Sequence, residues 1–124
     1  MSAIICDIDG TLLAGANGIK KTIEYINSQA SRYDINIVTG RPESERGNTT
    51  KALKANGVKY NRLIMNPHSS ANSYQYKHDT AKALQAKQKI VLAIDNDAKA
   101  RSAYASLQIK TMNPRNLPSP STKE

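Results

Sequence analysis

The 124-residue sequence contains no tryptophan, no phenylalanine and a single cysteine. One cysteine cannot form a disulfide within the chain, so we expect a reducing compartment and predict a cytoplasmic location. No apolar run approaches the roughly 18 residues of a membrane span, and the N-terminus does not resemble a secretory signal. Without Trp and Phe, the core must be built from Ile, Leu, Val, Ala and a few Tyr, which favours a compact α/β layer structure.

Acidic residues are also few, since 10 Asp and Glu stand against 18 Lys and Arg, for a formal net charge of +8. Four of the acids belong to the candidate site described below, which leaves 18 basic residues against 6 acidic ones elsewhere. Two interpretations stay open. The basic residues form an ordinary solvated surface that keeps the protein soluble, or they attract a polyanion such as nucleic acid.

The most informative segment is residues 3–13, where an apolar strand runs directly into two carboxylates, Asp7 and Asp9. Alternate residues of an extended chain point to the same side, so the two acids can share a pocket. Like charges at such a distance resist joint ionisation, and a hard divalent cation with oxygen ligands would offset them. A calcium loop starting at Asp7 is the alternative, but its twelfth position is Gly18 rather than Glu.

Strand-like and helix-like segments alternate along the chain, which predicts an open, mostly parallel α/β sheet. Residues 14–18 are predicted to be a short flexible loop and residues 66–76 a polar loop. The predicted strands lie near 3–8, 35–38, 62–65, 89–94 and 107–112, and the predicted helices near 19–31, 42–56, 80–88 and 98–106. We expect one domain over residues 1–112 and a disordered tail over 113–124, which contains three prolines and polar residues.

Polar residues follow three of these strands at the point where each strand ends. Asp7 and Asp9 follow the first, Thr39 follows the second, and Asp95 and Asp97 follow the fourth. Ligands of parallel α/β sheets bind beyond the carboxyl ends of the strands, so we expect these side chains to converge on one site.

The same residues, in this order, resemble the four motifs of the haloacid dehalogenase (HAD) superfamily of phosphatases. The matching segments are DIDGTL at 7–12, VTGR at 38–41, Lys77 just before a predicted helix, and IDND at 94–97. The resemblance implies a Rossmann-like three-layer sandwich. Its five-stranded, mostly parallel sheet has the order 5-4-1-2-3, with strands numbered along the chain.

The resemblance also implies a role for each residue of the site. Asp7 attacks phosphorus and forms an aspartyl-phosphate, and Asp9 acts as general acid and then as general base. Thr39 and nearby backbone N–H groups hold the phosphoryl oxygens, while Lys77 neutralises the developing charge. Mg²⁺ is bound by Asp7, the Asp9 carbonyl and Asp95. The expected enzyme is a Mg²⁺-dependent phosphoric monoester hydrolase.

Two positions of the site leave alternatives open. Lys82 is a rival of Lys77 for the role of the lysine. Asn96 stands where the family often has a second acid, so that role falls to Asp97 or is absent. Asp97 would otherwise only cap the following helix.

The sequence leaves no room for an inserted cap domain, because only a short loop precedes residue 19 and residues 40–76 hold a helix, a strand and a loop. An open site admits large substrates. A looser similarity links Thr39-Gly40-Arg41 and Lys77 to the phosphatase domain of phage-type polynucleotide kinase 3′-phosphatases. We expect Gly40 and Arg41 to bind substrate, and for Arg41 the alternative is an ordinary solvated charge. We therefore predict action on a nucleic-acid 3′-phosphate end or a nucleotide. The alternatives are a small-molecule phosphatase, for example for sugar phosphates, and a non-catalytic module that keeps the fold.

Overall fold

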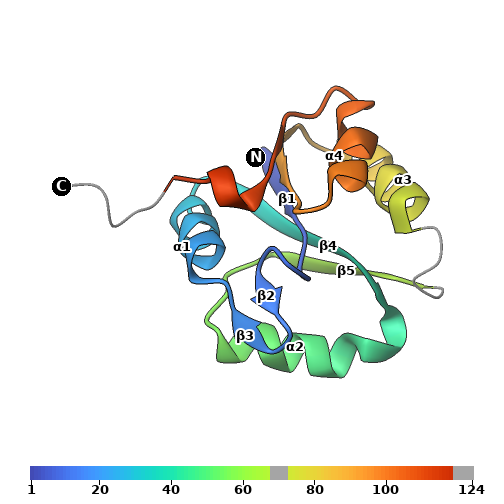
Figure 1. Ribbon diagram of the computed structural model, residues 1–124. Coiled ribbons are helices and arrows are strands. Elements are labelled where there is room, and N and C mark those ends of the chain that lie inside the picture. The colour runs from blue at the N-terminus through green and yellow to red at the C-terminus, as the bar shows by residue number, and fades with distance from the viewer. Residues whose placement is uncertain (68–72, 119–124) are drawn as a thin grey trace.

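The computed structural model describes residues 1–67 and 73–118, and one five-stranded sheet forms its centre (Figure 1). Its strands are β1 (Ala3–Cys6), β4 (Asp34–Pro42), β5 (Arg62–Asn66), β6 (Ile90–Ile94) and β7 (Thr111–Met112). They lie in the order β5-β4-β1-β6-β7, and each neighbouring pair is parallel. Counted along the chain, this is the predicted order 5-4-1-2-3 read from the other edge, so the predicted fold is confirmed.

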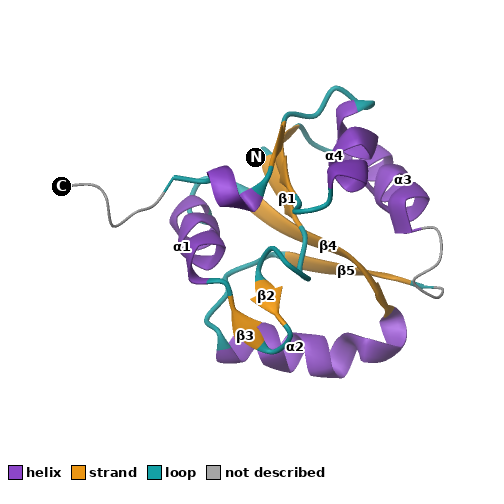
Figure 2. Ribbon diagram, in the orientation of Figure 1, coloured by secondary structure: helices purple, strands orange, loops and turns teal. Residues whose placement is uncertain are grey.

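Four helices cover the two faces of this sheet and complete a three-layer sandwich (Figure 2). They are α1 (Lys20–Gln29), α2 (Arg46–Ala55), α3 (Ser73–Gln85) and α4 (Ala98–Ala105). Ile4 and Cys6 of β1 pack with side chains of α1 and α2, whereas Ala3 and Ile5 pack with side chains of α3 and α4. The alternation of the central strand therefore gives each face of the sheet an apolar core of its own. Within the part of the chain that the structure describes, no helix is long and apolar enough to span a bilayer.

A small hairpin replaces the predicted flexible loop at residues 14–18. Its strands are β2 (Leu13–Ala14) and β3 (Asn17–Gly18), which pair antiparallel. Gly15 in its turn has φ +65°, a left-handed conformation that glycine adopts without steric cost. The prediction of an unstructured loop was wrong because Leu13, the residue after the first motif, is buried and pairs with Gly18. This hairpin is the only element between β1 and α1, so no cap domain is inserted there.

Helix α3 begins at Ser73, seven residues before the predicted start at residue 80. Lys77 therefore lies inside the helix rather than just before it, and this prediction was wrong. Lys77 and Ala81 are one turn apart and both are buried, so together they form the inner side of the helix. The start of the helix was missed because one of the residues on its buried face is a lysine, which breaks the apolar pattern typical of a buried helix face. Residues 68–72 of the predicted polar loop lie outside the described residues.

The chain continues to pack against the core beyond residue 112, where the sequence predicted the start of a disordered tail. A 3₁₀ helix, η2 (Pro114–Asn116), follows β7, and both Pro114 and Leu117 are buried. The Lys21 ammonium on α1 donates to the Arg115 carbonyl oxygen at 2.8 Å. The predicted boundary at residue 113 is therefore wrong for residues 113–118. Residues 119–124 of the predicted tail lie outside the described residues.

Candidate active site

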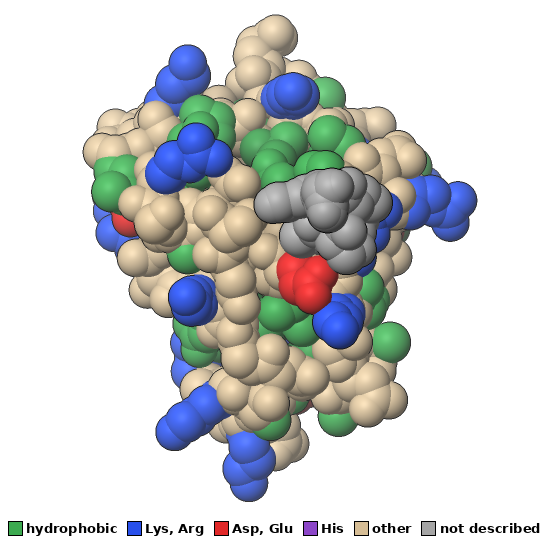
Figure 3. Space-filling model, turned by 90° about the vertical axis from the view of Figure 1, so that its left-hand side faces the viewer, with side chains coloured by type: hydrophobic (Ala, Val, Ile, Leu, Met, Phe, Trp, Pro, Cys, Tyr) green, Lys and Arg blue, Asp and Glu red, His purple; other side chains and the backbone are tan. Residues whose placement is uncertain are grey.

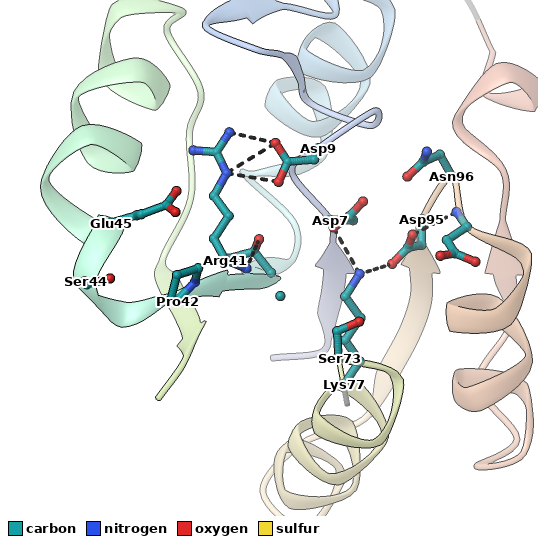
Figure 4. A pocket seen from close by; sticks show the side chains of 13 residues that line it. Asp7, Asp9, Arg41, Pro42, Ser44, Glu45, Ser73, Lys77, Asp95 and Asn96 are labelled. Carbon is teal, nitrogen blue, oxygen red and sulfur yellow. Dashed lines mark hydrogen bonds and ion pairs between the residues drawn. The ribbon is translucent and has the colours of Figure 1, made fainter. Parts of the chain in front are cut away.

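An open pocket of about 970 Å³ lies beyond the carboxyl ends of β1, β4 and β6, and the N-terminal part of α3 forms one wall (Figure 4). Every residue predicted for catalysis, substrate binding or metal binding lines it. Lys82, the alternative to Lys77, is exposed elsewhere on α3. The convergence expected from the strand ends is therefore what the fold produces.

A buried lysine bridges two buried carboxylates at the floor of the pocket (Figure 4). Lys77 Nζ donates to Asp7 Oδ1 at 3.1 Å and to Asp95 Oδ2 at 2.7 Å. The Asp95 side chain is fully buried, and those of Asp7 and Lys77 are nearly so. Asp95 Oδ1 accepts a further hydrogen bond from the Asp97 backbone N–H at 3.0 Å. Both oxygens of Asp95 thus accept hydrogen bonds, and these bonds hold the carboxylate in one orientation.

The three charged groups of this bridge shift one another's protonation. Burial and repulsion from Asp95 raise the pKa of Asp7 to about 7, although Lys77 opposes the rise. Burial disfavours the charged form of Lys77, but the carboxylates of Asp7 and Asp95 outweigh it and raise the pKa of this ammonium. Two carboxylates and one ammonium leave one negative charge without a partner when all three are ionised. The net negative charge at the pocket floor therefore favours the binding of an additional cation.

Thr11 and Asn96 surround the second carboxylate oxygen of Asp7. Thr11 Oγ1 donates to Asp7 Oδ2 at 3.1 Å, and the Asn96 side chain lies between that oxygen and the Asp9 carbonyl. With its nitrogen turned inward, the Asn96 amide donates to Asp9 O at 3.0 Å and to Asp7 Oδ2 at 3.1 Å. With its oxygen turned inward, that oxygen instead faces Asp9 O and Asp7 Oδ2 at the same two distances.

If the Asn96 oxygen turns inward, it joins Asp7 Oδ2 and the Asp9 carbonyl oxygen in a ligand set that suits a hard divalent cation. The described residues hold no group of three or more His, Cys, Asp and Glu side chains placed to bind a metal. A site at this position would therefore combine carboxylate, amide and backbone carbonyl oxygens. These are the ligand types that Mg²⁺ accepts beside water and phosphate.

Asp9, the second acid of the first motif, points away from Asp7 and toward Arg41 (Figure 4). The guanidinium group donates to both Asp9 oxygens, with N–O distances of 2.7, 3.0 and 3.2 Å. A third nitrogen of Arg41 donates to Thr49 Oγ1 on α2 at 2.9 Å. The hydrogen bond to Asp9 raises the pKa of Arg41 further. Asp9 is the more exposed partner of the pair, at 59% of its side chain against 17% for Arg41. The pair stands at the mouth of the pocket, on the α2 side.

The carboxyl-terminal residues of β4, where its pairing with β5 shifts in register, form another wall of the pocket. Thr39 is buried, and its Oγ1 accepts a hydrogen bond from the Arg41 backbone N–H at 3.1 Å. A Cβ on Gly40 would lie 3.0 Å from the Ser73 Cβ, so the small residue lets this end of β4 approach the start of α3.

Asp97 is occupied by contacts within the fold rather than turned into the centre of the pocket. Its Oδ1 accepts from the Lys99 backbone N–H at 2.8 Å and caps α4, and its Oδ2 accepts from the Tyr74 hydroxyl at 2.8 Å. The geometry thus places Asn96, not Asp97, beside the oxygens of Asp7 and Asp9. Sequence reasoning did not anticipate the contacts of Thr11 and Tyr74. Thr11 lies two residues after Asp9, within the first motif, which was an available signal, whereas Tyr74 lay in a segment predicted to be a loop.

A family model for the HAD superfamily, subfamily IIIB (acid phosphatase), matches residues 14–114 of the sequence. The matched range covers most of the chain and begins after Asp7 and Asp9, so the roles of these two residues rest on their motif and geometry. The sequence matches no curated protein.

Two solved structures share the fold. A chain of the Pnkp1/Rnl/Hen1 RNA repair complex superposes with a TM-score of 0.82 at 19% identity, over 90% of this chain and 42% of that chain. A second structure of the Pnkp1/Rnl/Hen1 complex gives a TM-score of 0.72 at 19% identity, over 90% of this chain and 45% of that chain. The protein therefore spans less than half the length of either chain.

Proposed function

The chain belongs to the HAD superfamily, subfamily IIIB (acid phosphatase). On this premise we propose that it is a Mg²⁺-dependent phosphomonoester hydrolase that works through an aspartyl-phosphate. The observation that supports the mechanism best is the buried bridge from Lys77 to Asp7 and Asp95. It fixes one carboxylate at the end of the central strand, beside a cation and facing an open pocket. A carboxylate held in this way can act as a nucleophile toward phosphorus.

In the proposed reaction, an Asp7 oxygen attacks phosphorus and the bond from phosphorus to the leaving oxygen breaks. Asp9 gives its proton to the leaving oxygen, and then takes a proton from the water that hydrolyses the aspartyl-phosphate. The Thr39 hydroxyl and the neighbouring backbone N–H groups bind the phosphoryl oxygens, and Lys77 offsets their growing negative charge. Because Asp9 is paired with Arg41, its carboxyl must turn toward the leaving group when substrate enters.

The proposed metal ligands are Asp7, the Asp9 carbonyl oxygen, Asn96 and Asp95. Mg²⁺ bound there would supply the positive charge that lets Asp7 and a phosphate dianion share one pocket. Asn96 is included because its amide lies beside the first two of these groups. Asp95 would contribute through the carboxylate that Lys77 also holds, and Asp97 is left with its capping role.

The proposed substrate is a nucleic-acid end that carries a 3′-phosphate, or a nucleotide. Three observations support it. The pocket is open, and Arg41 at its mouth can pair with a phosphate. Basic side chains are spread widely over the face in Figure 3 and outnumber the acidic ones there. The similar solved structures belong to an RNA repair complex. The cytoplasm is the proposed location, supported by the single cysteine, which is buried in β1.

The test is a substrate panel with Mg²⁺ that compares a 3′-phosphorylated oligonucleotide, nucleoside monophosphates and sugar phosphates. We expect the highest kcat/KM for the oligonucleotide, no turnover in EDTA, and no turnover by Asp7→Asn. Equal or higher kcat/KM on sugar phosphates would favour the small-molecule alternative and refute the nucleic-acid substrate. Absence of turnover on every phosphomonoester would refute the proposed activity itself.

A further inference from the structure

One tyrosine differs from the other five in its surroundings. Tyr25, Tyr33 and Tyr60 pack against one apolar core, and Tyr76 and Tyr104 belong to the other. Tyr74 is instead 39% exposed, as a large side chain in the first turn of α3. Tyr74 is therefore the most exposed of the six tyrosine side chains.

Tyr74 lies at the edge of the catalytic pocket. Its neighbour Ser73 lines the pocket, and Lys77 at the pocket floor follows less than one turn later on the same helix. The Tyr74 hydroxyl donates to Asp97 Oδ2 at 2.8 Å, and Asp97 also lines the pocket. The ring therefore bridges α3 and the start of α4 at the pocket's rim.

A hydrogen bond holds the Tyr74 ring in place, and the Lys99 ammonium lies close to the ring. Asp97 accepts from both the Tyr74 hydroxyl and the Lys99 backbone N–H, so the hydroxyl is tied to the capped end of α4. The Lys99 ammonium lies 5.9 Å from the centroid of the Tyr74 ring. A ring that is already fixed loses little conformational freedom when a flat ligand stacks on it.

We propose that Tyr74 stacks on the terminal nucleobase of a 3′-phosphorylated strand while the phosphate of that nucleotide occupies the pocket beside Asp7. This inference rests on the proposed function and specifies its substrate. Every nucleobase has a π-face, so an aromatic platform binds any sequence, and a sugar phosphate offers no such face. Lys99 attracts the adjacent backbone phosphate of the strand. Tyr74 is thus a specificity-determining residue for the terminal nucleoside.

The test compares two oligonucleotides of the same sequence that both end in a 3′-phosphate, one with a normal terminal base and one with an abasic terminal nucleotide. The wild type should prefer the base-containing substrate in kcat/KM by about 5- to 150-fold, the range that base–aromatic stacking spans. Tyr74→Leu should lose most of this preference. Tyr74→Phe keeps the ring and removes only the hydroxyl, so it should retain most of it. With β-glycerophosphate, which has no aromatic group, all three proteins should have the same kcat/KM.

A matched pair of lysine variants tests the charge. Lys99→Ala should weaken the oligonucleotide reaction and its dependence on salt, but leave a nucleoside 3′-monophosphate unaffected, because that substrate has no second phosphate. Lys59→Ala removes an exposed lysine that precedes β5, at the opposite end of the sheet, and should change neither reaction. If Lys99→Ala and Lys59→Ala have equal effects, Lys99 makes no local contact with the strand.

Three results would overturn the inference. They are a wild type that does not distinguish the two oligonucleotides, a Tyr74→Leu variant that still does, and a Tyr74→Phe variant that loses as much as Tyr74→Leu. Each of these can occur with normal hydrolysis of β-glycerophosphate, so the proposed activity would survive them. If no phosphomonoester is turned over, fluorescence anisotropy with the Asp7→Asn variant measures the same base preference as binding. Equal affinities for the two oligonucleotides would then refute the stacking.

Discussion

Asp7 should make the metal-free fold less stable as the pH rises, and replacing it with Asn should remove that weakness. Burial, reinforced by Asp95, raises the pKa of Asp7 from 3.8 to about 7. Between these values the folded protein keeps a proton that the unfolded chain has released, so stability falls as the pH rises. The stabilisation is complete below the unfolded pKa and is lost as the pH passes through about 7. One pKa unit is worth about 1.4 kcal/mol, so the whole loss is on the order of 4 kcal/mol.

An amide at position 7 has nearly the same shape and stays uncharged, as the protonated acid does. Asp7→Asn should therefore already be more stable than the wild type by about 1 to 2 kcal/mol at pH 5, because the unfolded wild-type chain has released its proton there. At pH 8 the difference should grow to about 4 kcal/mol. Urea unfolding followed by circular dichroism, in EDTA at both pH values, measures the difference. Lys77 keeps its charge across this range, because its pKa is raised above an ordinary value that already lies well above pH 8.

Addition of Mg²⁺ is the internal control for this experiment. The cation should stabilise the wild type more than the variant at pH 8, because only the wild type has a carboxylate at position 7 to bind it. Two outcomes would refute the reasoning. One is a difference between the proteins that does not change with pH, and the other is a variant that is less stable than the wild type at pH 8. Either would mean that the ionised form of Asp7 is well accommodated in the metal-free pocket.

Three further substitutions test the site and its surroundings. Lys77→Met leaves the two carboxylates that it joins facing each other, so we expect a loss of about 3 kcal/mol or more in urea unfolding at pH 8. The loss should be smaller at pH 5, where one carboxyl can take up a proton, and a pH-independent loss would argue for packing alone. Gly10→Ala introduces a Cβ 2.5 Å from the Asn96 amide nitrogen at a residue with φ +79°, so kcat/KM and the melting temperature should both fall. The Tyr104 hydroxyl is buried without a hydrogen-bond partner in the described residues, so Tyr104→Phe should be neutral or stabilising by up to about 1 kcal/mol in thermal unfolding.

The sheet could be predicted from the sequence because each of its signals is local. The central strand is continuously apolar, as expected for a strand covered on both faces, and two carboxylates mark its carboxyl end. The same pattern recurs at β6, followed by Asp95. A parallel sheet brings such ends to one edge, so the location of the pocket followed from the strands without any knowledge of the helices.

The remaining features depend on contacts between distant segments, which the local pattern does not contain. A lysine is normally exposed, and Lys77 is buried only because Asp7 and Asp95, which are distant in the sequence, bind its ammonium. The buried face of α3 could therefore not be predicted from the local sequence. Leu117 became a core residue only because the chain after β7 returns to the apolar face of the sheet that α1 and α2 cover. The role of Asn96 was likewise undecided, because side chains that follow Asp95 can turn either into the pocket or toward α4.

The charges at the pocket floor explain why binding and catalysis should be coupled in this protein. Asp7, Asp95 and Lys77 together carry one uncompensated negative charge when ionised, and burial makes that charge costly. A divalent cation would cancel it and leave one positive charge in excess, which would attract a phosphate dianion. The bound cation would favour the ionised form of the nucleophile near neutral pH, and the phosphate would be attracted more strongly to that state. We therefore expect the apparent affinity for Mg²⁺ and the affinity for phosphate to rise together, since each ligand stabilises the form that the other binds. Inorganic phosphate titrated with and without Mg²⁺ would measure this coupling, and phosphate affinities that do not depend on Mg²⁺ would contradict it.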